Sequence, residues 1–392
     1  MYRLRKLGRK HRGLLTTVSA FAALLLFGTI ISTSLAVWAT RAHRLAQMSL
    51  ASERNARQEA EAAKERADQF SKRLSMATQI TNDGIEYYNR SNWSAAHEQF
   101  TKAAEIEPGL NTPYIYRGGL YAYLGIWDRA AADYDRRFRL AGNASAQVCY
   151  EHALLSLFTG NESGYRAACD EMLKQHKSSA ESRTKLYLAR SCLLYDKPVG
   201  DPADLVLKAE NLVATANVPW HLGLAGRAHL HAGDLDQAVA RCREAIKLGN
   251  GSPAGIHRVN YLNLAMALHR QGKQSEAEQA LARAEQARDE WIKSMQVGWV
   301  GEMPFGWTEW LEFLILERQA RTLITGNPPS EDPRLSALYD RGLATITYGD
   351  IFTTMDAGRE QTKPAAACAS GEQAAASRHE ESSDNQAAAG RC

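Results

Sequence analysis

The sequence has little proline, almost no excess of charge and no closely paired cysteines. It holds 11 prolines in 392 residues, and 47 Lys and Arg nearly balance 44 Asp and Glu. A net charge of +3 does not give the concentrated basic surface that nucleic-acid binding needs, so we expect no nucleic-acid partner. The six cysteines contain no Cys-x-x-Cys, which excludes common zinc-ribbon and thioredoxin signatures. Few prolines and many alanines favour an all-α chain.

One long uncharged run follows a short basic segment at the N-terminus. Residues 1–12 carry six Lys and Arg, and residues 13–40 carry no charge. The run exceeds the roughly 20 residues that cross a bilayer and the roughly 7–15 of a signal-peptide core. We expect a retained transmembrane helix, with a cleaved signal as the alternative. The basic flank predicts a single-pass cell-membrane protein with a cytoplasmic N-terminus and its later residues outside the cytoplasm.

Residues 41–76 contain neither glycine nor proline and are rich in Ala, Glu, Arg and Gln, which predicts a helical stalk. Apolar side chains recur in it at alternating spacings of four and three residues, at Ala56, Ala60, Ala63, Ala67, Phe70 and Leu74. That spacing is typical of a coiled-coil seam. Alanine buries little area, so a single solvated helix and a homodimer through the stalk are both open.

A pattern with a period of 34 residues begins near Ala77. Its small and aromatic residues Gly84, Tyr87, Ala96 and Phe100 recur as Gly118, Tyr121, Ala130 and Tyr134. Small residues let two helices cross closely, and the aromatics fill the space between them. The register reappears in 219–245 and 258–284, four irregular helical segments occupy 145–217, and a closing helix covers 308–324.

This period and these residue types resemble the tetratricopeptide (TPR) repeat. The resemblance implies an α-solenoid of about six TPR-like helix pairs with a capping helix over residues 77–325. In residues 326–392 we expect a linker and a largely disordered tail, because no aromatic residue occurs after residue 352 and little apolar area can be buried. Residues 334–352 could form a helix or a strand. The tail cysteines Cys368 and Cys392 could cross-link chains or be placed by chance.

A broader resemblance covers roughly residues 2–324. It is carried by YRLRKLGRKHRGLL (2–15), GNESGYRAACDEML (160–173), GDPADLVLKAENLV (200–213), NYLNLAMALHRQGKQSEAEQALARAE (260–285) and WTEWLEFLILERQA (307–320). The arrangement of anchor, stalk and repeats resembles the C-terminal region of planctomycete-type bacterial receptor-like serine/threonine protein kinases. In that family a cytoplasmic kinase domain precedes the span.

The kinase motifs are missing from this sequence: no Gly-rich phosphate loop, Val-Ala-x-Lys, His-Arg-Asp or Asp-Phe-Gly occurs. We therefore expect no enzyme activity, and no catalytic, cofactor-binding or metal-binding residues. The resemblance implies a membrane-anchored protein-interaction module, the sensor or scaffold part of a kinase-like receptor without its catalytic domain. A free-standing envelope TPR scaffold, structural rather than signalling, is the alternative.

The expected ligand site is the concave groove lined by the first helix of each TPR pair. Carried over by register, the candidate residues for a protein or peptide ligand are Tyr88, Asn89, Tyr123, Trp220, Arg227, His231, Met266, His269 and Arg270. The later members are basic and aromatic, which suits an extended peptide carrying acid. Thr81 and Ile85 stand where the chaperone-binding TPR subclass carries a Lys/Asn clamp, which disfavours that partner. An ordinary solvated groove rim is the alternative.

Overall fold

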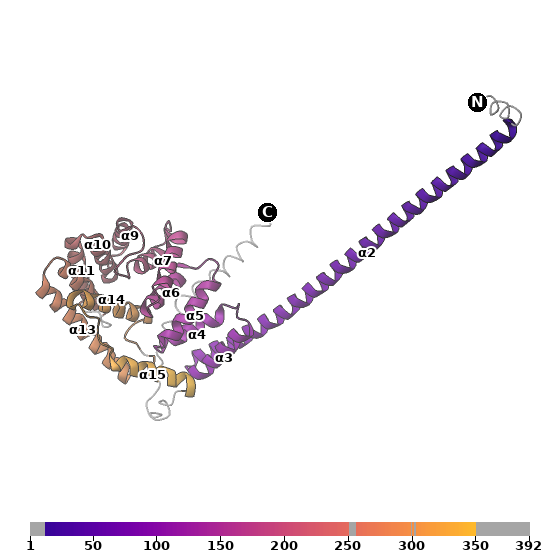
Figure 1. Ribbon diagram of the computed structural model, residues 1–392. Helices are drawn as coiled ribbons and strands as arrows, with labels where there is room; N and C mark the ends of the chain where they lie inside the picture. The colour runs from indigo at the N-terminus through magenta and orange to yellow at the C-terminus, as the bar shows by residue number, and fades with distance from the viewer. Residues whose placement is uncertain (1–11, 251–255, 299, 302, 350–392) are drawn as a thin grey trace, which may run out of the picture. The chain divides into compact units, whose positions relative to one another are not determined.

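The computed structural model describes residues 12–250, 256–298, 300–301 and 303–349. Within them every regular element is a helix (Figure 1), so the all-α expectation is confirmed. The chain's contacts divide it into two units, Met1–Arg73 and Leu74–Cys392. Three segments of the sequence lie outside the described residues. They are the expected basic segment except for Arg12, the centre of the 250–257 loop, and the C-terminal tail with Cys368 and Cys392.

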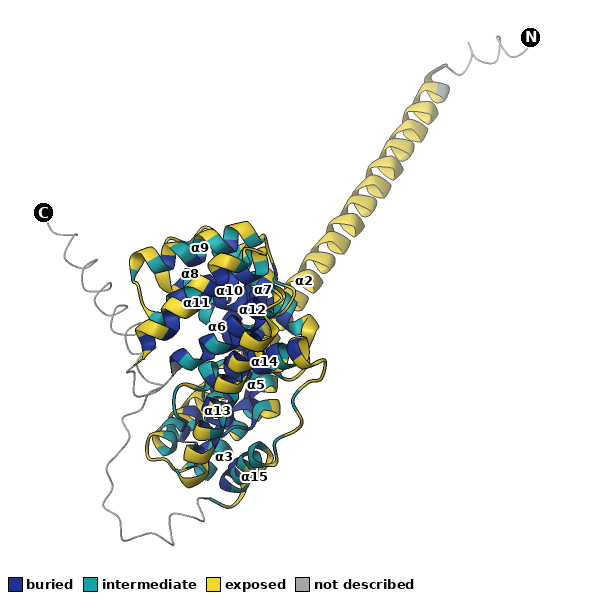
Figure 2. Ribbon diagram, turned by 90° about the vertical axis from the view of Figure 1, so that its left-hand side faces the viewer, coloured by how far each residue is buried: buried dark blue, intermediate teal, exposed yellow. Residues whose placement is uncertain are grey.

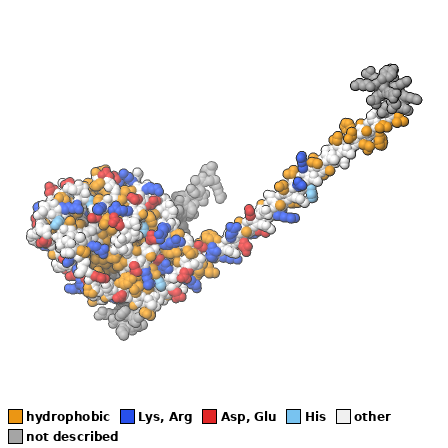
Figure 3. Space-filling model, in the orientation of Figure 1, with side chains coloured by type: hydrophobic (Ala, Val, Ile, Leu, Met, Phe, Trp, Pro, Cys, Tyr) orange, Lys and Arg blue, Asp and Glu red, His pale blue; other side chains and the backbone are white. Residues whose placement is uncertain are grey.

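The first unit contains the first part of helix α2 (Arg12–Asn89). No glycine or proline interrupts α2 between residues 29 and 83, which explains its unbroken length. Its apolar side chains are exposed, including Leu24 at 70% and Phe27 at 67%. By length and composition this helix could cross a membrane, a test that a signal sequence also passes. Figure 3 shows charged side chains on α2 only after this apolar stretch.

The second unit is an array of six helix pairs (Figure 1). The end of α2 pairs with α3 (Trp93–Ile106). The following pairs are α4 (Thr112–Tyr123) with α5 (Trp127–Leu140), α6 (Ala146–Phe158) with α7 (Glu162–His176), α8 (Ser182–Cys192) with α9 (Pro202–Thr215), α10 (Pro219–Ala232) with α11 (Leu235–Gly249), and α12 (Asn260–Arg270) with α13 (Gln274–Val297). A short 3-10 helix, η1 (Ile256–Val259), precedes α12.

Close helix crossings explain the small residues of the repeat. A Cβ added at Gly84 would lie 2.6 Å from the Phe100 ring, and one at Gly226 would lie 2.6 Å from the Cys242 sulfur. The second helices α3, α7, α9 and α11 also have side-chain N-caps. For example, Asn92 accepts from the Ala95 amide and Asp234 from the Gln237 amide. Local crossing and capping residues therefore help to define these pairs.

Two further helices complete the described chain. Helix α14 (Trp307–Thr325) contacts α12 and α13 of the last pair, as expected of a capping helix, and it also contacts α6. Helix α15 (Pro333–Tyr348) decides the open question of residues 334–352 in favour of a helix, and it contacts α3 and α13. In Figure 2 the buried residues gather where α6, α10, α12 and α14 meet. A closing helix therefore also forms part of the core.

Candidate functional site

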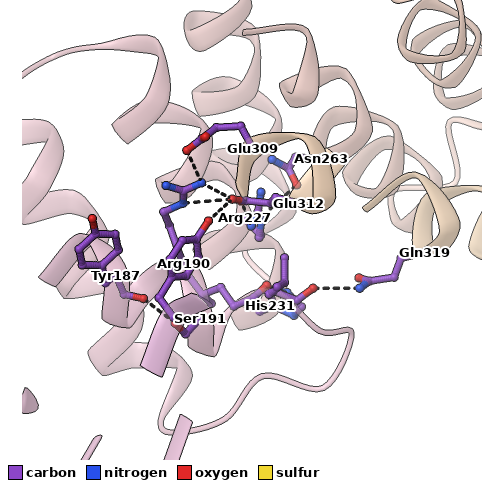
Figure 4. Close-up of polar contacts among 12 residues, drawn as sticks. Tyr187, Arg190, Ser191, Arg227, His231, Asn263, Glu309, Glu312 and Gln319 are labelled. Atoms are coloured by element: carbon purple, nitrogen blue, oxygen red, sulfur yellow. Dashed lines mark hydrogen bonds and ion pairs between the residues drawn. The ribbon is translucent and has the colours of Figure 1, made fainter. Parts of the chain in front are cut away.

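A single carboxylate on α14 gathers donors from three first helices of the array. Arg190 of α8 donates to Glu312 Oε2 from Nε at 3.0 Å and from Nη2 at 2.7 Å. Arg227 of α10 donates from Nη1 to Oε1 at 2.7 Å, and Tyr150 of α6 donates to Oε2 at 3.4 Å. Figure 4 shows the two arginines converging on this acid. Glu312 therefore links α14 to the first helices of the third, fourth and fifth pairs.

Neighbouring groups hold both arginines in place. The Arg190 guanidinium carbon lies 4.6 Å from the Tyr150 ring centroid and 4.5 Å from that of Trp220, distances at which cation–π attraction acts. Its Nη2 also donates to Glu309 Oε1 at 3.0 Å. Arg227 donates from Nε to the Asn263 oxygen of α12 at 3.2 Å. This site therefore joins side chains from four consecutive helix pairs.

The site is buried and stays ionised. Arg190 is 5% exposed, while Arg227 and Glu312 are each 3% exposed. Burial alone would raise the pKa of Glu312, but the charges of Arg190 and Arg227 outweigh it and lower that pKa to about 2. Burial also raises the pKa of the Tyr150 hydroxyl, which stays protonated as a donor. Such an arrangement binds a carboxylate presented by a helix.

The late groove candidates lie around this network. Arg227 belongs to it, and Trp220 stacks on Arg190. His231 donates from Nε2 to the Leu193 carbonyl at 3.1 Å. Burial, with Arg227 and Arg270 nearby, lowers the pKa of His231 to about 4. Thus the imidazole is neutral near pH 7.

The other late candidates differ in exposure. Met266 is buried, at 7% exposed. His269 is half-buried and shares a hydrogen bond with Gln274. Arg270 is exposed and donates to the Leu230 carbonyl at 3.1 Å. The late candidates therefore do not form one open surface.

The early candidates form a separate aromatic group on the first two pairs. The Tyr88 ring lies 5.3 Å from that of Trp93 and 6.5 Å from that of Tyr116. Trp93 lies 5.5 Å from Tyr123, centroid to centroid. All four side chains are half-buried, and the neighbouring Asn89 is exposed. The structure thus divides the predicted groove into a late part beside α14 and an early aromatic part, and ligand binding by either part stays a prediction.

Sequence reasoning missed the centre of the late part, namely Arg190, Glu309 and Glu312. The signal was present in the run WLEFLI (310–315), where one acid interrupts an apolar stretch of the closing helix. A lone charge in such a run indicates a buried ion pair. Its partner Arg190 is 122 residues away in sequence, a distance that no local spacing can bridge.

Metal and thiol chemistry are not built into the described residues. Among them, no group of three or more His, Cys, Asp or Glu is placed to hold a metal ion. Cys149, Cys169, Cys192 and Cys242 are all 0% exposed. Burial raises the pKa of Cys149 and of Cys242 to about 12, so these thiols are protonated and act as apolar packing groups.

Comparisons with known proteins find similarity in solved structures alone. No family model and no curated protein matches the chain. A TPR protein from Parabacteroides merdae is 10% identical with a TM-score of 0.40, and the match covers 68% of this chain and 98% of that one. PilW, a type IV pilus biogenesis factor, is 16% identical with a TM-score of 0.37, covering 56% of this chain and 97% of PilW. These scores are low, so the solenoid assignment depends on the helix pairing described above.

Proposed function

We propose that the chain is a membrane-anchored TPR-type interaction module that binds a protein or peptide through its concave face. We further propose that it is the sensor or scaffold part of a serine/threonine kinase-like receptor. The kinase link is supported by the sequence resemblance over residues 2–324. The interaction role is supported by the chemistry of the concave face.

The observation that carries the proposal is that α14 packs against first helices of the array, with Glu312 held by Arg190 and Arg227. In TPR proteins the first helices line the concave groove. This contact supports the proposal that the concave surface recognises a helix that carries an acidic side chain. Here the chain itself supplies that helix across the middle and late pairs. The accessible groove is then the early aromatic part, with Tyr88, Tyr116 and Tyr123 half-buried. Half-buried tyrosines are typical of protein-binding surfaces.

The anchor is supported by the exposed apolar side chains of residues 13–40. Leu24, Phe27 and Leu35 are 70%, 67% and 59% exposed. Contact of such side chains with water costs about 25 cal/mol per Å² of apolar area, and lipid removes this cost. A bilayer around this segment, with the repeats outside the cytoplasm, is the arrangement that we propose.

Site-specific photo-crosslinking in intact cells tests the interaction role. A photo-reactive amino acid would replace Tyr88, with the exposed Glu105 of α3 as the control position. We expect a discrete adduct with a partner protein from position 88 and none from position 105. Adducts from both positions, or from neither, would contradict binding through the early groove.

The identity of the captured protein tests the receptor role separately. Capture of a membrane-spanning protein that carries a cytoplasmic serine/threonine kinase domain would support it. Capture of structural envelope proteins alone would contradict it. ATP binding or autophosphorylation by the purified chain without a partner would instead contradict the expected lack of enzyme activity.

A further inference from the structure

A cavity of about 690 Å³ lies outside the Glu312 network. It is lined by α13, α14, α15, the turn between α4 and α5, and Val300, Gly301 and Met303. Small-molecule sites usually measure about 300–1,000 Å³. Of the predicted groove residues only Tyr123 lines it. Its size thus fits a small molecule, and its place differs from the proposed peptide groove.

The walls of the cavity are largely aromatic and aliphatic. They include Trp127, Phe158, Met303, Trp310, Leu314 and Leu338, which come from five different segments of the chain. Gly301 has a φ of +83°, and a Cβ there would lie 2.2 Å from the Tyr123 ring. The loop can therefore close one side of the cavity only because residue 301 is glycine. Walls of this kind suit an apolar ligand body.

One polar pair lies among these walls. Glu317 of α14 is 2% exposed and accepts from Arg288 Nη1 of α13 at 2.7 Å. Arg288 lines the cavity, and its side chain is 16% exposed. Its Nη1 donates to Glu317, and its Nη2 donates to Asp289 at 3.3 Å. Each Nη atom carries two hydrogens, so a ligand oxygen in the cavity can accept from one of them.

The charges around the cavity nearly cancel and disfavour an ionic ligand. The lining holds three arginines and four acids, namely Arg288, Arg318 and Arg341 with Glu317, Glu331, Asp332 and Asp340. Arg341 donates to the Gly298 carbonyl at 2.7 Å, and Asp332 accepts from Arg334. An anion would meet the acids and a cation would meet Arg288, so a neutral molecule fits best.

We propose that this cavity is a binding site for an uncharged, apolar small molecule whose carbonyl oxygen accepts a hydrogen bond from Arg288. The cavity and the early groove share Tyr123, but the other lining residues of the cavity lie outside that groove. Besides α15 and the loop residues Val300, Gly301 and Met303, the lining includes α13, Tyr123 and Trp127. The bound molecule would therefore bridge the last helix pair, through α13, and the second pair, through Tyr123 and Trp127. The proposal therefore assigns the closing segments a ligand-binding role.

Nile red is a suitable probe, because it is an uncharged aromatic dye with a carbonyl acceptor. The full chain in lipid nanodiscs would be titrated with the dye, and the signal of empty nanodiscs subtracted. Leu314→Trp on α14 and Leu338→Trp on α15 would each fill part of the cavity. Leu207→Trp, on the 61% exposed Leu207 of α9, is the matched control. Arg288→Lys keeps the charge but removes the planar guanidinium with its Nη donors.

We expect one saturable site for the wild type and for Leu207→Trp. Either filling variant should weaken it roughly tenfold or more, and Arg288→Lys roughly three- to tenfold. If at least one filling variant keeps the thermal unfolding midpoint of the wild type, its loss of dye binding comes from the filled cavity and not from unfolding. The proposal is overturned if the dye partitions without saturation, or if both filling variants bind as the control does.

Discussion

Removing the Glu312 carboxylate should destabilise the repeat array more than any surface change. In a Glu312→Ala variant, Arg190 and Arg227 would keep their charges while losing the acid between them. Both arginines are at most 6% exposed in their side chains. Leaving a buried charge without its partner costs about 3–5 kcal/mol. Asn263 and Glu309 remain as partial partners, so we expect the lower part of that range.

The pKa of Glu312 gives a second measure of the same interaction. It is lowered from 4.5 to about 2 by Arg190 and Arg227 against the opposing effect of burial. Each tenfold change in an ionisation constant is worth about 1.4 kcal/mol, which gives about 3 kcal/mol. Because the folded pKa is lower than the unfolded one, this stabilisation is present above about pH 4.5 and is lost as the pH falls towards 2.

Urea unfolding of the full chain in detergent, followed by tryptophan fluorescence, measures this cost, since Trp220 stacks on Arg190. Glu276→Ala is the matched control, because Glu276 pairs with Arg243 at 2.9 Å with side chains 48% and 55% exposed. We expect a change within about 0.5 kcal/mol for the control. A Glu312→Ala variant that loses less than about 1 kcal/mol would refute the role given to this buried network.

Three further predictions concern packing, titration and thiols. Gly226→Ala should cost about 1–3 kcal/mol in the free energy of unfolding, because its Cβ would meet the Cys242 sulfur. Gly119→Ala, where a Cβ meets nothing within 4 Å, should instead gain about 0.5–1 kcal/mol in the same urea assay. Burial raises the pKa of Glu317 from 4.5 to about 7 despite Arg288, so stability should fall as the pH rises from about 4.5 to 7. In Glu317→Gln the free energy of unfolding should change less between about pH 4.5 and 7. An unchanged pH dependence would contradict the role given to Glu317. In a Cys368→Ser/Cys392→Ser chain, maleimide should label none of the four buried cysteines until denaturant is added, and labelling of the native chain would show that they are accessible.

The helix pairs could be predicted because their determinants are local. The 34-residue period placed Gly84 and Gly226 at crossings, where the structure leaves no room for a Cβ. The four irregular segments expected within 145–217 correspond to α6, α7, α8 and α9. Many of these helices begin or end at a local cap or breaker, such as Asn92 before α3, Pro202 at the start of α9 and Gly233 after α10. Spacing along the chain is therefore enough to find them.

The position of α14 could not be predicted in the same way. Its apolar face indicated a helix that covers the last pair, and it does contact α12 and α13. Its contact with α6 and the pairing of Glu312 with Arg190 join segments more than 100 residues apart. Arg227 occupied an expected groove position, yet its partner is this internal acid. Long-range partners of this kind follow from three-dimensional packing, which a local pattern does not contain.

The proposed anchor and its orientation are tested most directly by a reporter fusion. A reporter enzyme that is active only outside the cytoplasm would follow the C-terminus of the full chain, and the cells would then be fractionated. We expect activity in the membrane fraction, and release into the soluble fraction from a chain with a protease site inserted after residue 40. Activity that is soluble without cleavage would indicate a removed signal peptide. An inactive reporter would place the helix pairs in the cytoplasm and contradict the proposed topology.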